Sequence, residues 1–339
     1  MRGNFTSLSD LASEVSRIEN SKNDYLVQAS GLSMIQDSAL AVQGEGHFTI
    51  NDYAHGQVAS KLGIPKQYYD KMSEIEGLRT INVNEWLRKR SDEQQYVRTL
   101  DGKVRAFLSE RFRPIDNYAV LSSFLPALQG NDVKIQTSAL SEKKMYLQIL
   151  FPKNELEVRK GDVVQQGIIL TNSEVGAGAV DVKHMIWRLV CSNGMIGMSI
   201  LRKYHIGRTL EDDIFREDTM RAELEAFKLK FRDVIADALS QKNFIEQVNK
   251  LKDATEDKIV KVTETVSNVT KRFGLSEKHN DMIIQNMAEE GNMNRYGLAN
   301  GLTFLAHSLD NIDAQYEVEK YGSQVINMTK TEWNKYAVA

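Results

Sequence analysis

The composition of this chain changes abruptly at about residue 210. Residues 211–264 contain 14 acidic and 10 basic residues, but no glycine and no proline. Apolar residues recur there at the spacing of one helical face, namely Leu224, Phe227, Phe231, Ile235 and Leu239. Residues 211–339 are therefore predicted to be entirely helical, with breaks near Gly274, Gly291 and Gly322.

The residues before this change carry mainly strand signals. Runs rich in β-branched and apolar residues predict strands in LRTINV (78–83), KVRAFLS (103–109), DVKIQTSAL (132–140) and MYLQILF (145–151), and further strands within 163–206. Short helices are predicted over 7–20, in two segments of 51–76, and over 116–128. Because little helix separates the strands, parallel crossovers are not expected. The predicted fold is α+β: a twisted antiparallel or mixed sheet backed by helices in residues 1–210, then a helical region, 211–339.

Composition also limits the chemistry that we expect. The net charge of −3 gives no global attraction to nucleic acid, so an anionic partner must meet a local basic patch. The single cysteine, Cys191, excludes an intramolecular disulfide and cysteine-based zinc sites. The six histidines show no metal-binding spacing, so we expect no metal and no cofactor. The N-terminus lacks the apolar core of a signal peptide and no run is long enough to span a membrane, which predicts a cytoplasmic protein.

Three short motifs have a structural interpretation beside a functional one. The loop 172–179 contains Gly176 and Gly178, but no helix or Gly-Lys-Ser/Thr follows as phosphate-binding loops require, which favours a plain connection between strands. Asn193-Gly194 predicts a β-hairpin, because both central residues of such a turn take positive φ. Cys191 could be a nucleophile with His184 or His205 as its base, although a buried structural cysteine is the favoured interpretation.

Two strand segments carry a local excess of basic residues. Residues 98–113 contain five Lys or Arg against two acids, and residues 183–208 contain five Lys or Arg and no acid. Guanidinium and ammonium groups can hold phosphates, and aromatic rings can stack on bases. If both strands lie in one sheet, they could form a groove. The candidate phosphate contacts are Arg105, Arg111, Arg113, Lys183, Arg188, Arg202, Lys203 and Arg208, and the stacking candidates are Phe112, Trp187 and Tyr204.

Three stretches resemble a family of unknown function that occurs in phages, plasmids and other mobile elements. They are ASKLGIPKQYY (59–69), LSERFRPIDN (108–117) and RLVCSNG (188–194), and the last is the most specific. The layout that we predict is also similar to that of Rad52-type single-strand annealing proteins. That similarity implies DNA binding in a basic groove of an oligomeric ring, although a fold does not by itself imply a function.

These observations support three hypotheses. The first is a non-enzymatic protein that binds single-stranded DNA, self-associates and anneals strands in recombination. The second is a protein-interaction module that modulates or inhibits a host factor through the acidic helices of 211–339. The third is an enzyme with an unfamiliar site that uses Cys191 or a carboxylate cluster. The absence of a catalytic signature favours the first two.

Overall fold

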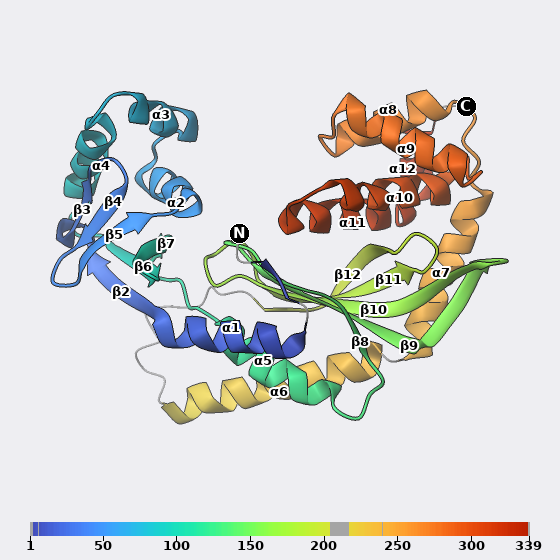
Figure 1. Ribbon diagram of the computed structural model, residues 1–339, viewed down its shortest axis with the longest axis horizontal. Helices are drawn as coiled ribbons and strands as arrows, with labels where there is room; N and C mark the ends of the chain where they lie inside the picture. The colour runs from blue at the N-terminus through green and yellow to red at the C-terminus, as the bar shows by residue number, and fades with distance from the viewer. Residues whose placement is uncertain (1–2, 6, 204–216, 239, 338–339) are drawn as a thin grey trace.

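The computed structural model describes residues 3–5, 7–203, 217–238 and 240–337. The chain forms two six-stranded sheets, each covered by helices (Figure 1). The first unit comprises residues 22–109, and the second unit comprises the other described residues. The α+β class is confirmed, with two sheets where one was predicted. The predicted boundary near residue 210 lies outside the described residues.

The first unit is a mixed sheet in the order β2-β6-β7-β5-β4-β3, in which β5 and β7 are parallel. Its strands are β2 (Lys22–Gln28), β3 (Leu32–Ile35), β4 (Ala39–Val42), β5 (Gly46–Ile50), β6 (Gln94–Leu100) and β7 (Lys103–Ser109). Its helices are α2 (Asp52–Leu62), α3 (Lys66–Lys71) and α4 (Leu78–Lys89). Val58 and Val83 of these helices are buried against Phe107 of the sheet. The two helices predicted within 51–76 are confirmed as α2 and α3.

The strand predicted over residues 78–83 is wrong, because these residues begin helix α4. Arg79, Val83 and Leu87 are its buried residues, and their spacing of four places them on one helical face. The six residues from which we predicted a strand were too few to show this helical spacing, which becomes clear only when Leu87 is included.

The second unit contains an entirely antiparallel sheet in the order β1-β8-β9-β10-β11-β12. Its strands are β1 (Gly3–Asn4), β8 (Lys134–Leu140), β9 (Met145–Arg159), β10 (Asp162–Asn172), β11 (Val180–Arg188) and β12 (Asn193–Lys203). Successive residues of a strand point to opposite faces. Ile168 accordingly packs on one face with Phe231, whereas Ile169 packs on the other with Tyr316.

Helices cover both faces of this sheet (Figure 1). One face carries α1 (Leu8–Ser21), α5 (Asn117–Phe124) and α6 (Glu217–Ala238), whose apolar residues share one core. The opposite face carries α10 (Arg295–Phe304) and α11 (Ile312–Ile326). The remaining helices are α7 (Gln241–Glu256), α8 (Val262–Arg272), α9 (Glu277–Glu289) and α12 (Lys330–Trp333). No helix among the described residues is long and apolar enough to cross a membrane.

Two of the three predicted helix breaks are confirmed. Gly274 follows α8 and Gly291 follows α9, both with positive φ, as expected of glycines that end helices. Gly322 is instead inside α11, so that prediction was wrong. A Cβ atom at Gly322 would clash with Thr303 and lie 2.8 Å from the carbonyl oxygen of Ala299 on α10. This glycine therefore permits two helices to pack closely.

We expect Gly322→Ala to lower the free energy of unfolding by about 1–3 kcal/mol, because the added methyl group overpacks the contact between α10 and α11. Gly56→Ala in α2 is the matched control, since its Cβ would meet only the Lys66 side chain at 3.5 Å. That variant should gain up to about 1 kcal/mol from higher helix propensity. Urea denaturation measures the free energy of unfolding of both variants. An equal change in the two would contradict the close packing of α10 against α11.

The hairpin predicted at Asn193-Gly194 forms, but its turn consists of residues 189–192, which precede these two residues. Strands β11 and β12 pair around residues 189–192, and Ser192 takes the positive φ of 51°. Asn193 and Gly194 already belong to β12, where they pair with Arg188 and Trp187. The loop 173–179 is a connection between β10 and β11, as predicted.

Candidate functional site

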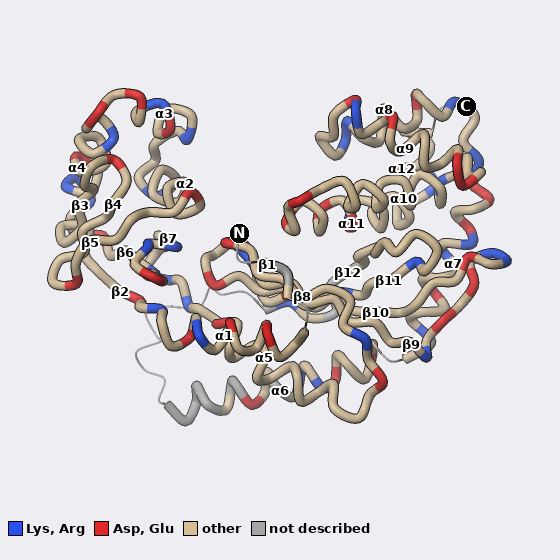
Figure 2. Tube along the Cα trace, viewed as in Figure 1, with Lys and Arg blue, Asp and Glu red and all other residues tan. Residues whose placement is uncertain are grey.

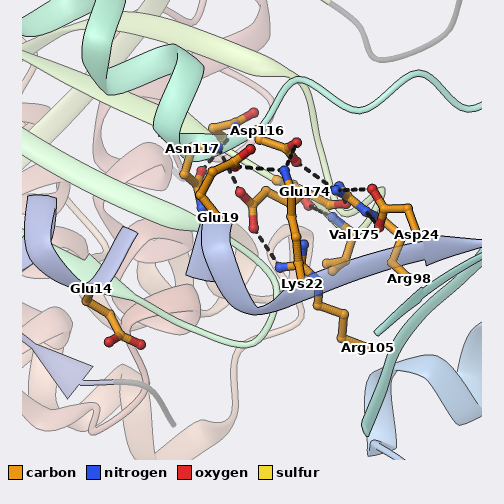
Figure 3. Close-up of polar contacts among 12 residues, drawn as sticks. Glu14, Glu19, Lys22, Asp24, Arg98, Arg105, Asp116, Asn117, Glu174 and Val175 are labelled. Atoms are coloured by element: carbon orange, nitrogen blue, oxygen red, sulfur yellow. Dashed lines mark hydrogen bonds and ion pairs between the residues drawn. The ribbon is translucent and has the colours of Figure 1, made fainter. Parts of the chain in front are cut away.

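A buried network of charged side chains joins the two units (Figure 3). Arg98 of β6 is fully buried, and its guanidinium donates to both carboxylate oxygens of Asp24 at 2.7 and 2.8 Å. It also donates to Asp116, immediately before α5, at 2.8 Å, and to the backbone oxygen of Glu174 at 2.7 Å. Burial alone would raise the pKa of Asp116, but Arg98 and Lys22 lower it.

Arg105, a candidate phosphate contact, belongs to the same network. Its Nη1 atom lies 2.6 Å from Oε2 of Glu174, and both side chains are buried. The second oxygen of Glu174 accepts the backbone N–H of Asn117 at 2.8 Å and so caps α5. Because Arg105 is only 3% exposed and pairs with a buried carboxylate, the expectation of an exposed phosphate contact is corrected here.

Two further candidates are buried in the second unit. Arg188 donates to Asp162 at 2.7 and 2.9 Å and to Glu290 at 2.7 and 2.8 Å. Trp187 is 8% exposed and packs within a cluster that includes Tyr316. Arg188 is therefore neutralised by two acids, so the expectation of an exposed phosphate contact at Arg188 is corrected. Trp187 is largely buried but lines a cavity beside Tyr316, so stacking on its ring stays a prediction.

The two basic segments do not share a sheet. Arg105 lies on β7 of the first sheet, and Lys183 lies on β11 of the second. Figure 2 shows acidic and basic residues interspersed along both units. The single groove predicted from two adjacent strands is therefore wrong, because the chain places these strands in separate sheets.

The remaining candidates are dispersed. Arg111 is exposed just after β7, and Arg113 is partly buried. Phe112 is partly buried, and the centre of its ring lies 6.2 Å from the centre of the Tyr96 ring. Lys203 ends β12, and only its backbone is described. Two other candidates, Tyr204 and Arg208, lie outside the described residues.

Lys183 lies in a cluster of cations that the sequence did not reveal. The ammonium groups of Lys144, Lys183 and Lys320 lie 5.6, 5.5 and 5.1 Å from the ring centre of Tyr316. These distances are typical of cation–π contacts. Lys183 also donates to the Tyr316 hydroxyl at 3.0 Å. Lys144 precedes β9, Lys183 is on β11 and Lys320 is on α11, so only the folded chain brings them together.

Acidic neighbours partly neutralise this cluster. Lys183 lies 3.3 Å from Asp181, and Lys320 lies 2.7 Å from Glu317. Burial alone would lower the pKa of Lys183, but its hydrogen bond to Tyr316 raises it. Arg202, another candidate, is exposed and lies 3.8 Å from Asp181. These partners hold the ammonium groups in place.

A cavity of about 270 Å³ lies beside the cluster, between β11, β12 and α11. We call it the lysine pocket. Ammonium, amide and hydroxyl groups line it, and all of these can donate hydrogen bonds to phosphate oxygens. Its polar lining residues are Lys183, Lys320, Ser323, Gln324 and Asn327. Lys320 could not be identified from sequence, because no pattern around it differs from an ordinary solvated helix face.

The surroundings of Cys191 do not favour a nucleophile. Its thiol donates to Glu290 at 2.9 Å, and burial together with this hydrogen bond raises the pKa of Cys191 to about 11. The thiol therefore keeps its proton at neutral pH, whereas the thiolate is the reactive form. Of its two candidate bases, His184 has a pKa lowered by burial, and His205 lies outside the described residues.

Comparison with known proteins places the chain in a family. The family model described as Domain of unknown function (DUF932) matches residues 105–339. The chain belongs to this family. The DUF932 match begins within β7 and includes Lys144, Lys183 and Lys320, whereas most of the first unit precedes it. No curated protein and no solved structure matches the chain.

Proposed function

We propose that this protein binds single-stranded DNA and that the lysine pocket holds the phosphates of the strand. The observation that carries the proposal is the convergence of Lys144, Lys183 and Lys320 around Tyr316, beside a cavity that Lys183 and Lys320 line. Lysine ammonium groups bind nucleic acid by neutralising phosphates and releasing counterions. Since the chain carries a net charge of −3, binding depends on local cations such as these.

A single strand suits the pocket better than a duplex does. The pocket lies between a sheet and α11, and a flexible phosphate backbone can bend into such a space. A duplex holds its phosphates on a stiff cylinder, which could meet only the rim. Our proposal extends to self-association and strand annealing, in line with the resemblance to phage and plasmid proteins and to Rad52-type proteins.

Fluorescence anisotropy tests the proposal directly. The full chain is titrated against a labelled single strand and the matching duplex, each at a low and a moderate salt concentration. We expect the single strand to bind more tightly, with an affinity that falls steeply as salt rises. Absence of binding at low salt would overturn the proposal and favour the protein-interaction hypothesis.

The Lys183→Gln/Lys320→Gln double variant should bind the single strand about tenfold more weakly or worse, which corresponds to 1.4 kcal/mol. Losing two phosphate contacts should also reduce the slope of log affinity against log salt by about 1.4. The matched control is Lys252→Gln/Lys278→Gln, which removes the same charge from exposed positions on α7 and α9. Equal losses in both double variants would mean that only net charge matters.

A further inference from the structure

A second cavity, of about 280 Å³, is lined by Tyr316 and lies along the same helix, α11, as the lysine pocket. One stretch of α11 lines both cavities. Tyr316 and Glu319 line the second cavity, and Lys320 and Ser323 line the lysine pocket. The Tyr316 hydroxyl, which accepts from Lys183 at 3.0 Å, connects the two. A ligand held by the lysines could therefore extend one group into this cavity.

The lining of the second cavity combines flat aromatic surfaces with hydrogen-bonding groups. Tyr146, Trp187 and Tyr316 supply the rings, and Gln148 and Gln315 supply amides. Drug-sized ligands occupy about 300–1,000 Å³, so a cavity just below that range suits a single heterocycle. Stacking on aromatic side chains together with edge hydrogen bonds is how proteins hold an unpaired base.

Glu319 is the buried carboxyl group in the wall of this cavity. It is 7% exposed, lines the cavity, and accepts hydrogen bonds from the Gln148 amide at 2.8 Å and from the Gly194 backbone N–H. Among the described residues no Lys, Arg or His forms an ion pair with it within 4 Å. Burying a carboxyl group without a cation is unfavourable unless hydrogen bonds or a proton compensate it. Beyond these two bonds, a neutral carboxyl group keeps one hydroxyl hydrogen to donate and further lone pairs to accept, so it can pair with a ligand edge that has a donor beside an acceptor.

We infer that this cavity binds one nucleobase by its Watson–Crick edge. The inference rests on the proposed function, because the base arrives on a strand that the lysines hold. Burial raises the pKa of Glu319 to about 8, so at neutral pH the carboxyl group is one donor and one acceptor. Every base presents an adjacent donor and acceptor on that edge. The cavity thus accepts unpaired bases without strong sequence preference and rejects paired ones, whose edges are occupied.

The experiment compares two labelled strands of equal length, one with normal bases and one with abasic sites throughout. Both retain the phosphates that the lysines contact, so their difference isolates the base. We expect the normal strand to bind wild-type protein about tenfold more tightly, since stacking and two hydrogen bonds are lost with the base. Glu319→Leu should reduce that difference to about twofold or less, while Glu319→Gln, which keeps a donor and an acceptor, should preserve it.

A second measurement separates the base from the strand. Free adenosine is titrated while tryptophan fluorescence is recorded, because Trp187 lines the cavity. A saturable change in wild type that Glu319→Leu loses supports the inference, whether or not any strand binds. Equal, salt-sensitive binding of normal and abasic strands, with no response to adenosine, would overturn the inference and leave DNA binding intact. If neither strand nor adenosine binds, both proposals fail.

Discussion

The Arg98→Met variant is expected to unfold with a free energy about 3–5 kcal/mol lower than that of the wild type. Methionine fills a similar volume, so the loss comes from charge and hydrogen bonding. Without the guanidinium, the carboxylates of Asp24 and Asp116 stay close together and partly buried, with Lys22 as the remaining cation at Asp116. The Glu174 backbone oxygen also loses a donor at 2.7 Å.

Arg17→Met is the matched control for this prediction. Arg17 also contacts two carboxylates, Glu14 and Asp101, but its side chain is 45% exposed. Surface ion pairs contribute about 0–1 kcal/mol, so this variant should be nearly neutral. Urea denaturation of both proteins gives the comparison. A loss below about 1 kcal/mol for Arg98→Met would show that the buried network does not hold the two units together.

The second large effect is a dependence of stability on pH that comes from Glu319. Its pKa is raised from 4.5 to about 8 by burial. Between these values the folded chain keeps a proton that the unfolded chain releases. The free energy of unfolding should therefore fall as pH rises from about 5 to about 8, by on the order of a few kcal/mol in total. Gln148, the Gly194 backbone N–H, Tyr146, Tyr316 and His307 are the polar and titratable groups around this carboxyl.

Glu319→Gln should remove this component of the pH dependence. Its amide cannot ionise, and the Gln148 amide can rotate to provide the acceptor that the new N–H group needs. The variant should match wild type near pH 5 and exceed its stability near pH 8. Thermal unfolding at both pH values measures this, with Glu289→Gln on the surface of α9 as the control. A variant that is equally destabilised at both pH values would contradict the prediction.

The sequence predicted those parts of the fold that depend on local periodicity. The helical spacing from Leu224 to Ile235 gave the core face of α6, since Phe227 and Phe231 are buried there. Residues 78–83 misled us because a helix and a strand cannot be distinguished over six residues when β-branched side chains dominate. The hairpin of β11 and β12 was predictable from a local turn signal, whereas the division of the strands between two sheets was not.

The site was less predictable because it depends on pairs that are distant along the chain. Arg105 and Arg188 have the side chains of phosphate ligands, and only the fold shows that Glu174 and Asp162 already occupy them. Lys183 was identified from its basic segment. Lys144 was missed because Tyr316, the ring that it contacts, lies on α11, far away along the chain. Lys320 lies on α11 itself and was missed because its surroundings in the sequence are those of an ordinary solvated helix face.

The connectivity of the two units has a consequence for how the chain folds during synthesis. Helix α1 and strand β1 belong to the second unit, yet the whole first unit follows them in the chain. Domains fold as they emerge from the ribosome, so residues 22–109 can complete their sheet early. Leu11, Val15 and Ile18 must wait for Val120, Phe124 and β9 before their apolar face is covered. A nascent chain stalled after the first unit would therefore present this helix to chaperones.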